Sequence, residues 1–208
     1  MSIGPITDLP LGDGTPMVAR GVSGDGSVIV GSGSALFSTN PPQTASVPFR
    51  WTAGAGAVGV LDNGQFFGLP LGAIATSVSA DGSVLAGQAN GIWRWTAATG
   101  FEIVRSGAGT TDLQRLSGDG NTLTDGDRLW RLGIGLQPLA TVLTDAGCPI
   151  GGWTNLRVTD TSFNGRTLCG YGTNPAGQTE AWYATIPAPG VSALLVVAGV
   201  WTVRRRRD

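Results

Sequence analysis

Apolar residues alternate with polar or small residues in short runs along this chain, and glycine-rich turns separate the runs. A period of two is typical of half-buried β-strands. We find no helical period before residue 186. The pattern therefore predicts an all-β body, and only the last part of the chain departs from it.

A turn that ends in glycine recurs four times, each time followed by a short β-branched or apolar run and then by a tryptophan. The run ends at a glycine in the first, second and fourth units, and at Asp125 in the third unit. This fixed order indicates an internal repeat. The turns are Ser23-Gly24-Asp25-Gly26, Ser79-Ala80-Asp81-Gly82, Ser117-Gly118-Asp119-Gly120 and Ser162-Phe163-Asn164-Gly165, and the tryptophans, which we assign to one structural position, are Trp51, Trp95, Trp130 and Trp182.

The residue types explain the repeat as a set of hairpins. Asp-Gly and Asn-Gly supply the positive φ angles of a tight hairpin, and the flanking residues have strand propensity. In the first two units the Trp segments and the residues after the next glycine turn add a third and a fourth strand. The predicted strands are 18–23, 27–31, 49–52 and 57–61, then 75–79, 83–87, 93–96 and 101–104.

Four short strands per unit are typical of a propeller blade of about 40–50 residues. We predict a β-propeller-like repeat domain over residues 1–185. Three arrangements stay open: a ring in which residues 3–9 supply the missing last strand, part of a larger propeller, and a β-solenoid. The units are expected at about 12–70, 71–110, 111–156 and 157–185.

Composition excludes several kinds of chemistry. The chain has no His and no Lys, and all 13 basic residues are Arg. These absences remove the usual general base, the common nucleophile pairs, Schiff-base chemistry and most zinc and haem sites. Without residues 204–208 the body has nine Arg against thirteen acids, which argues against nucleic acid as a partner.

Two cysteines, Cys148 and Cys169, fit no metal-ligand spacing. In an oxidising compartment they could form a disulfide, and in a cytosol they would be two buried thiols. Both alternatives stay open from the sequence.

The tail, residues 186–208, changes character. A Pro-rich segment is followed by thirteen uncharged, mainly apolar residues, 191–203, and then by Arg204, Arg205, Arg206 and Arg207. As a helix the apolar stretch would be about 20 Å long, shorter than a hydrocarbon core of about 30 Å. Terminal arginines favour the cytoplasmic side. We predict a C-terminal hydrophobic helix that engages a membrane, rather than a buried core helix, because four adjacent Arg have no nearby carboxylates.

The tail resembles the PEP-CTERM sorting signal of Gram-negative and related bacteria. Pro187, Ala188, Pro189 and Gly190 stand where that family usually has Pro-Glu-Pro. The resemblance implies export, retention in the inner membrane by residues 191–203, and cleavage by an exosortase-type membrane protease. Residues 1–13 lack the charged and apolar segments of a signal peptide, so we expect further sequence before Met1.

The body resembles the HAF-repeat family of extracellular, propeller-like repeats. Residues 21–31 and 48–52 carry the resemblance and recur as 77–87 and 93–96, and residues 170–182 look like a terminal repeat. Val47-Pro48-Phe49 replaces the His-Ala-Phe triplet of the family name. Neither resemblance implies a catalytic residue, a cofactor or a metal.

Three kinds of candidate chemistry have simpler explanations. The repeated tryptophans could stack on sugars, but a recurring position favours the core. Oxygen ligands around Asp119 could bind calcium, but turn geometry explains them better because Asn164 replaces the repeated Asp. A glycosidase needs two paired carboxylates, and no spacing pairs any of the candidates. The candidate calcium ligands are Asp119, Asn121, Asp125 and Asp127. The candidate glycosidase carboxylates are Asp62, Glu102, Asp145, Asp160 and Glu180.

We therefore expect an exported, non-catalytic repeat protein of the cell surface or an extracellular matrix. Its expected partners are the sorting protease, the inner membrane, and extracellular polysaccharide or surface proteins. Two alternatives remain: a polysaccharide-active hydrolase or lyase on a propeller scaffold, and a cytoplasmic scaffold with a degenerate tail.

Overall fold

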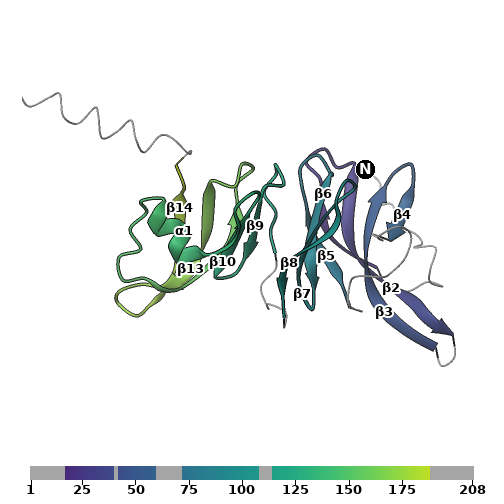
Figure 1. Cartoon of the computed structure of the whole chain (residues 1–208), viewed down its shortest axis with the longest axis horizontal. Helices are drawn as coiled ribbons and strands as arrows, with labels where there is room; N and C mark the ends of the chain where they lie inside the picture. The colour runs from purple at the N-terminus through teal and green to yellow at the C-terminus, as the bar shows by residue number, and fades with distance from the viewer. Residues whose placement is uncertain (1–16, 40–41, 60–71, 108–113, 188–208) are drawn as a thin grey trace, which may run out of the picture.

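The computed structural model describes residues 17–39, 42–59, 72–107 and 114–187, and it is all-β except for one short helix. Four small antiparallel sheets follow one another in chain order along the long axis of the molecule (Figure 1). Sheet 1 consists of β1 (Val18–Val22), β2 (Val28–Thr39), β3 (Pro42–Thr52) and β4 (Gly56–Gly59), and sheet 2 of β5 (Ile74–Val78), β6 (Val84–Ala89), β7 (Gly91–Thr96) and β8 (Gly100–Ser106). Sheet 3 consists of β9 (Thr122–Asp125), β10 (Arg128–Arg131) and β11 (Gly135–Pro138), and sheet 4 of β12 (Thr154–Thr161), β13 (Thr167–Thr173) and β14 (Thr179–Thr185).

The first two sheets confirm the predicted order of four strands, whereas sheets 3 and 4 have three strands each. In the third unit the first strand is reduced to a bridge between Leu116 and Leu123. The fourth unit has no strand after β14 among the described residues, as its sequence indicated. Strand β12 begins at Thr154, within the range expected for the third unit.

A helix before residue 186 was not predicted, and that expectation is wrong. Helix α1 (Leu139–Asp145) follows Pro138, whose φ of −58° suits the start of a helix. Leu139, Val142 and Leu143 are its buried residues. Seven residues give the i, i+3, i+4 spacing only once, so the helical period is too short to recognise in the sequence.

The four repeated turns share one network of hydrogen bonds. In the second turn, the Ser79 hydroxyl donates to Asp81 Oδ1 at 2.5 Å, the Ser83 N–H donates to the same oxygen at 3.0 Å, and the Val84 N–H donates to the Ser79 hydroxyl at 2.9 Å. In each turn the glycine has a positive φ and the Asp or Asn before it does not. The prediction that both residues of the Asp-Gly or Asn-Gly pair adopt positive φ was therefore wrong. The Asp is an acceptor, and Asn164 Oδ1 replaces it in the fourth turn.

The turn carboxylates predict a loss of stability in acid. Hydrogen bonds from the Ser27 N–H and from Ser23 and Ser27 hydroxyls lower the pKa of Asp25 from 3.8 to about 2, and Ser79 and Ser83 lower the pKa of Asp81 to about 2 in the same way. A depressed folded-state pKa contributes stability above the unfolded pKa of about 3.9, and that contribution is lost as pH falls through 2.

We expect urea unfolding midpoints to fall between pH 4 and pH 2, and to fall less steeply in the double variant D25N/D81N. The amide keeps the acceptor oxygen but does not titrate. An equally steep fall in the variant would show that other carboxyls cause the acid sensitivity.

A glycine faces an aromatic ring across the second and third strands in three of the four sheets. The pairs are Gly31 with Phe49, Gly87 with Trp93, and Gly170 with Trp182. A Cβ on any of these glycines would overlap the ring and a carbonyl oxygen of the first strand. Glycine at this position is therefore required for the close approach of the chain.

These pairs correct our assignment of four tryptophans to one position. Trp51, Trp95 and Trp130 are equivalent, since they pair with Ile29, Leu85 and Leu123. Trp182 instead occupies the position of Phe49 and Trp93. Core packing, the explanation we favoured, describes Trp130 and Trp93 well, and Trp51, Trp95 and Trp182 are partly buried against hydrophobic core clusters.

Sheets 2 and 3 each bury their two faces against the two neighbouring sheets. In sheet 2, Leu85 and Trp93 pack toward sheet 1, whereas Val84, Ala86 and Ile92 pack toward sheet 3. This alternation follows from the period of two along a strand. The hydrophobic core is therefore a series of layers between sheets, without a single centre.

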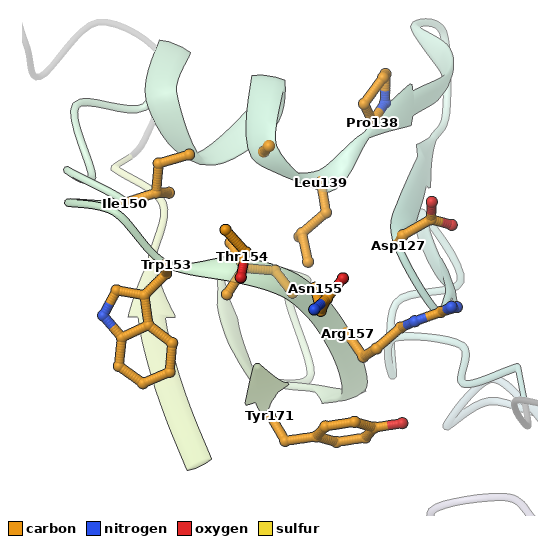
Figure 2. Close-up of a pocket in the computed structure, with 11 residues that line it drawn as sticks. Asp127, Pro138, Leu139, Ile150, Trp153, Thr154, Asn155, Arg157 and Tyr171 are labelled. Atoms are coloured by element: carbon orange, nitrogen blue, oxygen red, sulfur yellow. The ribbon is translucent and has the colours of Figure 1, made fainter. Parts of the chain in front are cut away.

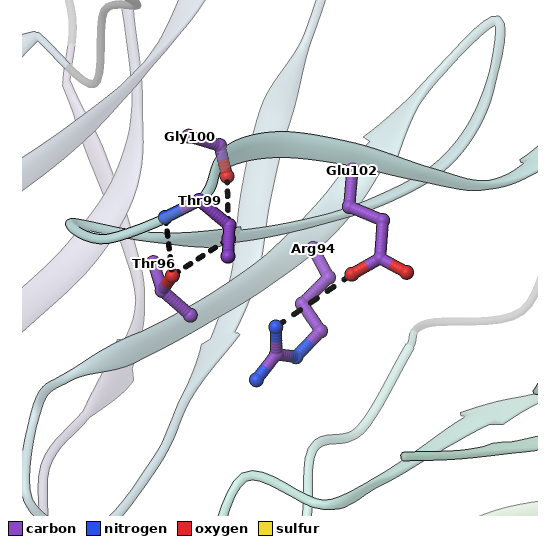
Figure 3. A network of polar contacts seen from close by, with 5 residues as sticks. All are labelled: Arg94, Thr96, Thr99, Gly100 and Glu102. Atoms are coloured by element: carbon purple, nitrogen blue, oxygen red, sulfur yellow. Dashed lines mark hydrogen bonds and ion pairs between the residues drawn. The ribbon is translucent and has the colours of Figure 1, made fainter. Parts of the chain in front are cut away.

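Polar contacts add to the layer between sheets 2 and 3. The guanidinium of Arg94 lies 5.4 Å from the ring centroid of Trp130, within cation–π range. Arg94 also pairs with Glu102 across β7 and β8 at 3.7 Å, beside the hydrogen bonds of Thr96 and Thr99 in the connecting turn (Figure 3).

The four turns are joined to one another by backbone hydrogen bonds. The Gly24 N–H donates to the Ala80 carbonyl, and the Ala80 N–H donates to the Gly118 carbonyl, both at 2.8 Å. At the last step the Asp119 N–H donates to the Phe163 carbonyl at 2.9 Å. We call this series the turn ladder. It fixes the spacing of successive sheets at one end of each hairpin.

Both thiols are free in this structure. Cys148 follows α1 and packs against the core that contains Leu168. Cys169 is the next residue on β13, so its side chain points to the opposite face and is exposed. The two cysteines lie on opposite sides of β13, and no disulfide joins them.

Two expectations concern parts of the chain outside the described residues. Pro187 is the last described residue and is exposed, whereas Ala188, Pro189, Gly190 and the predicted C-terminal helix lie beyond it, as do Arg204 to Arg207. Residues 3–9, one candidate for the missing strand, also lie outside. Within the described ranges, no helix is long and apolar enough to cross a membrane.

Candidate binding pocket beside Trp153

The structure does not bring the candidate carboxylates together. Glu102 pairs with Arg94, Asp160 Oδ1 accepts from the Thr161 N–H, and Glu180 accepts from Asn174 at 2.9 Å. They lie on β8, β12 and β14 respectively. Asp145 is the last residue of α1, and Asp62 lies outside the described residues.

The candidate calcium ligands are also separated. Asp119 and Asn121 belong to the third turn, where Asp119 Oδ1 accepts the Asn121 N–H at 3.0 Å. Asp125 pairs with an arginine, and Asp127 lines a pocket. In the described part of the chain no three His, Cys, Asp or Glu side chains are grouped as metal ligands.

A pocket of about 530 Å³ lies between the start of α1 and strand β12 (Figure 2). Aromatic, apolar and charged side chains meet in it. Figure 2 shows the guanidinium of Arg157 on the same side as Asp127, and the indole of Trp153 at the other end. The lining residues are Asp127, Pro138, Leu139, Ala140, Ile150, Trp153, Thr154, Asn155, Leu156, Arg157 and Tyr171.

The connection between α1 and β12 forms one wall of this pocket. Gly147, Gly151 and Gly152 all have positive φ, which lets this connection turn back sharply. The Trp153 N–H donates to the Ile150 carbonyl at 2.7 Å and closes the last turn before β12. Backbone hydrogen bonds therefore set the position of Trp153.

Asn155 is the only non-glycine residue with a positive φ, 52°, among those described. The pairing of β12 with β13 shifts between Thr154 and Arg157, so Asn155 lies in a bulge. Its side-chain amide donates to the Thr173 hydroxyl at 3.3 Å. Bulges and αL residues re-aim side chains and are common beside functional sites.

A second pocket, of about 540 Å³, adjoins the first along the edge strand β14. Ile150, Trp153 and Leu156 line both pockets, so Trp153 stands between them. Tyr171 lines only the first pocket and Tyr183 only the second. The two tyrosines are therefore a matched pair for separating the pockets experimentally.

The third unit also carries a buried ion pair near the first pocket. Asp125 is 1% exposed and accepts from Arg105 Nη1 of β8 at 2.8 Å, and this contact raises the pKa of Arg105 above its ordinary value. Asp125 and Arg128 occupy the position of the glycine–aromatic pair in the other units. The pair links sheet 2 to sheet 3.

Sequence reasoning did not find the pocket. Trp153 lies outside the four repeated tryptophan positions, and that exclusion was the available signal. Asn155 and Arg157 lie in a strand with no motif of its own, and Tyr171 lies in the segment that resembles a terminal repeat, which does not indicate a pocket. A bulge and a glycine-rich connection, neither visible as a motif, bring these side chains together.

No family model matches this sequence, and no curated protein matches it. Among solved structures, TolB from Acinetobacter baumannii is similar, with a TM-score of 0.49 and 13% identity over 83% of this chain. The match covers 41% of TolB, so this chain spans less than half the length of that structure.

Proposed function

We propose that this chain is an exported, non-catalytic repeat protein with a propeller-like body that binds a glycan in the pocket beside Trp153. Its tail, residues 186–208, would direct membrane retention and cleavage by an exosortase-type protease. The pocket carries the binding part of the proposal, because it combines aromatic walls with side chains that hydrogen-bond hydroxyl groups.

The chemistry of the lining suits a sugar. The C–H face of a pyranose packs on an indole or phenol ring, and hydroxyls pair with amide, guanidinium and carboxylate groups. Trp153 and Tyr171 supply the rings, and Asn155, Arg157 and Asp127 supply the polar groups. The described carboxylates are not paired for hydrolysis, which favours binding over cleavage.

Binding to an array of immobilised glycans, followed by calorimetry with a soluble hit, tests this proposal. We expect Y171A to weaken binding about ten-fold or more, because truncating a central aromatic contact commonly costs over 1 kcal/mol. The matched variant Y183A removes a tyrosine from the second pocket and should bind like the wild type. Equal loss in both variants, no binding to any glycan, or release of free sugar during the assay would contradict the proposal.

The sorting part has its own test. In the native host, we expect the released protein to end within residues 187–190, as found by mass spectrometry of its C-terminal peptide. A variant with Arg204 to Arg207 changed to Gln should be retained poorly and cleaved less. Released protein that still ends at residue 208 would contradict the sorting mechanism.

A further inference from the structure

In the second, third and fourth repeated turns, the glycine packs on the preceding sheet. Gly82 lies on Val28, Gly120 on Val84 and Gly165 on Thr122, so closely that a Cβ on any of these glycines would overlap the underlying side chain. All three glycines are buried. The same contact therefore joins sheets 1 to 2, 2 to 3 and 3 to 4.

At the two ends of the series of sheets, each half of this contact lacks its partner among the described residues: the turn glycine at sheet 1 and the underlying side chain at sheet 4. Gly26 has the same positive φ as the other turn glycines, but it is exposed, and no atom of the described residues lies within 4 Å of where its Cβ would be. At the other end, Thr167 is equivalent to Val28, Val84 and Thr122 and is exposed. The first sheet thus has an unused glycine, and the last sheet has an unused surface for one.

The turn ladder is open in the same complementary way. In the described part of the chain, the Gly24 carbonyl accepts no backbone hydrogen bond, whereas its equivalents Ala80, Gly118 and Phe163 each accept one. The Phe163 and Asn164 N–H groups likewise donate none. An acceptor is available at the first turn and donors are available at the last.

Apolar side chains are exposed at both ends. Val22 is 61% exposed, although its equivalent Val78 packs between sheets 1 and 2. Tyr183, on the outer face of sheet 4, is 81% exposed. These side chains would be covered if the series of sheets continued.

We propose that the outer face of sheet 4 binds the turn end of sheet 1 of a second copy of this chain. Gly26 of the second copy would lie on Thr167, and its Gly24 carbonyl would accept from the Phe163 or Asn164 N–H. The proposal rests on continuity with an interface that the chain already forms three times. It does not rest on glycan binding or on the sorting tail.

The geometry also sets the strength and the symmetry of this association. Phe49 and Ala57, on the outer face of sheet 1 farther from the turn, are already buried, so the new contact is confined to the turn end. A small contact gives weak association. Because two different surfaces meet, each copy keeps one free end, and copies add head to tail into a ring or an open array.

Sedimentation equilibrium of the full chain in detergent micelles tests the proposal, with G26A compared with G177A. Both glycines have positive φ and open space around them, so alanine strains both turns alike. We expect the average mass of the wild type and of G177A to rise with concentration. G26A should raise the apparent Kd at least ten-fold. Any association through the tail is common to all three proteins.

A mixing experiment tests the head-to-tail direction. G26A blocks the turn end, and T167W blocks the face of sheet 4, so each variant alone should not extend. Mixed together they should form a dimer of one copy each and nothing larger. A wild type that stays monomeric, equal association of G26A and G177A, or a dimer of G26A alone would overturn the proposal.

Discussion

Replacing Gly87 by alanine is expected to destabilise the protein by about 3 kcal/mol or more. The new Cβ would overlap the Ile74 carbonyl oxygen of β5 and the buried ring of Trp93. A backbone carbonyl inside a strand pair cannot move away cheaply, so the strain is not relieved by a rotamer change. The measurement is the free energy of unfolding in urea for the variant and the wild type.

Gly54→Ala is the matched control for this prediction. Gly54 lies in the turn between β3 and β4, and no atom in the described part of the chain lies within 4 Å of its Cβ position, so the same substitution should change stability little. The double variant G87A/W93A should not recover stability, because the overlap with the Ile74 carbonyl remains. A loss in G87A no larger than in G54A would show that β5 and β6 are not packed as described.

Replacing Arg105 by methionine is expected to cost about 3 kcal/mol, because it leaves the buried carboxylate of Asp125 without its charged partner. Asp125 Oδ1 is buried and has no hydrogen-bond partner among the described residues, so Arg105 is its main compensation. Methionine keeps much of the volume of the side chain. Thermal and urea unfolding of R105M against the wild type measure the effect.

The double variant R105M/D125N is the control for this ion pair. Removing both charges leaves no buried charge to compensate, so its stability should lie well above that of R105M. A loss of less than about 1 kcal/mol in R105M would show that Asp125 is solvated or protonated when alone.

The sequence was most informative where one residue type has one structural use. The Ser-x-Asp-Gly turns located the hairpins of sheets 1 and 2, because glycine is the residue that adopts positive φ without strain. The position of a residue within its sheet was harder to predict from the sequence. Trp182 follows a turn as Trp51 does, but only the register of β13 with β14 shows that it faces Gly170.

The candidate site could not be predicted from the sequence, for a different reason. Tyr171 and Arg157 face each other across β12 and β13, a pairing that depends on a shift at Asn155. A shift of one residue moves every following side chain to the other face of a strand. Local patterns do not encode where such a shift occurs, and helix α1, which closes the pocket, was too short to be recognised.

Layered cores and a turn ladder mean that, within the described ranges, each sheet is held by its immediate neighbours. Cooperativity in such a series is passed from neighbour to neighbour, so partial unfolding can begin at one sheet without involving all four. Amide hydrogen exchange should then be graded, slowest in β6 and β9 and faster in β13. The buried Arg105–Asp125 pair lies at the middle boundary, where it would resist the separation of the two halves.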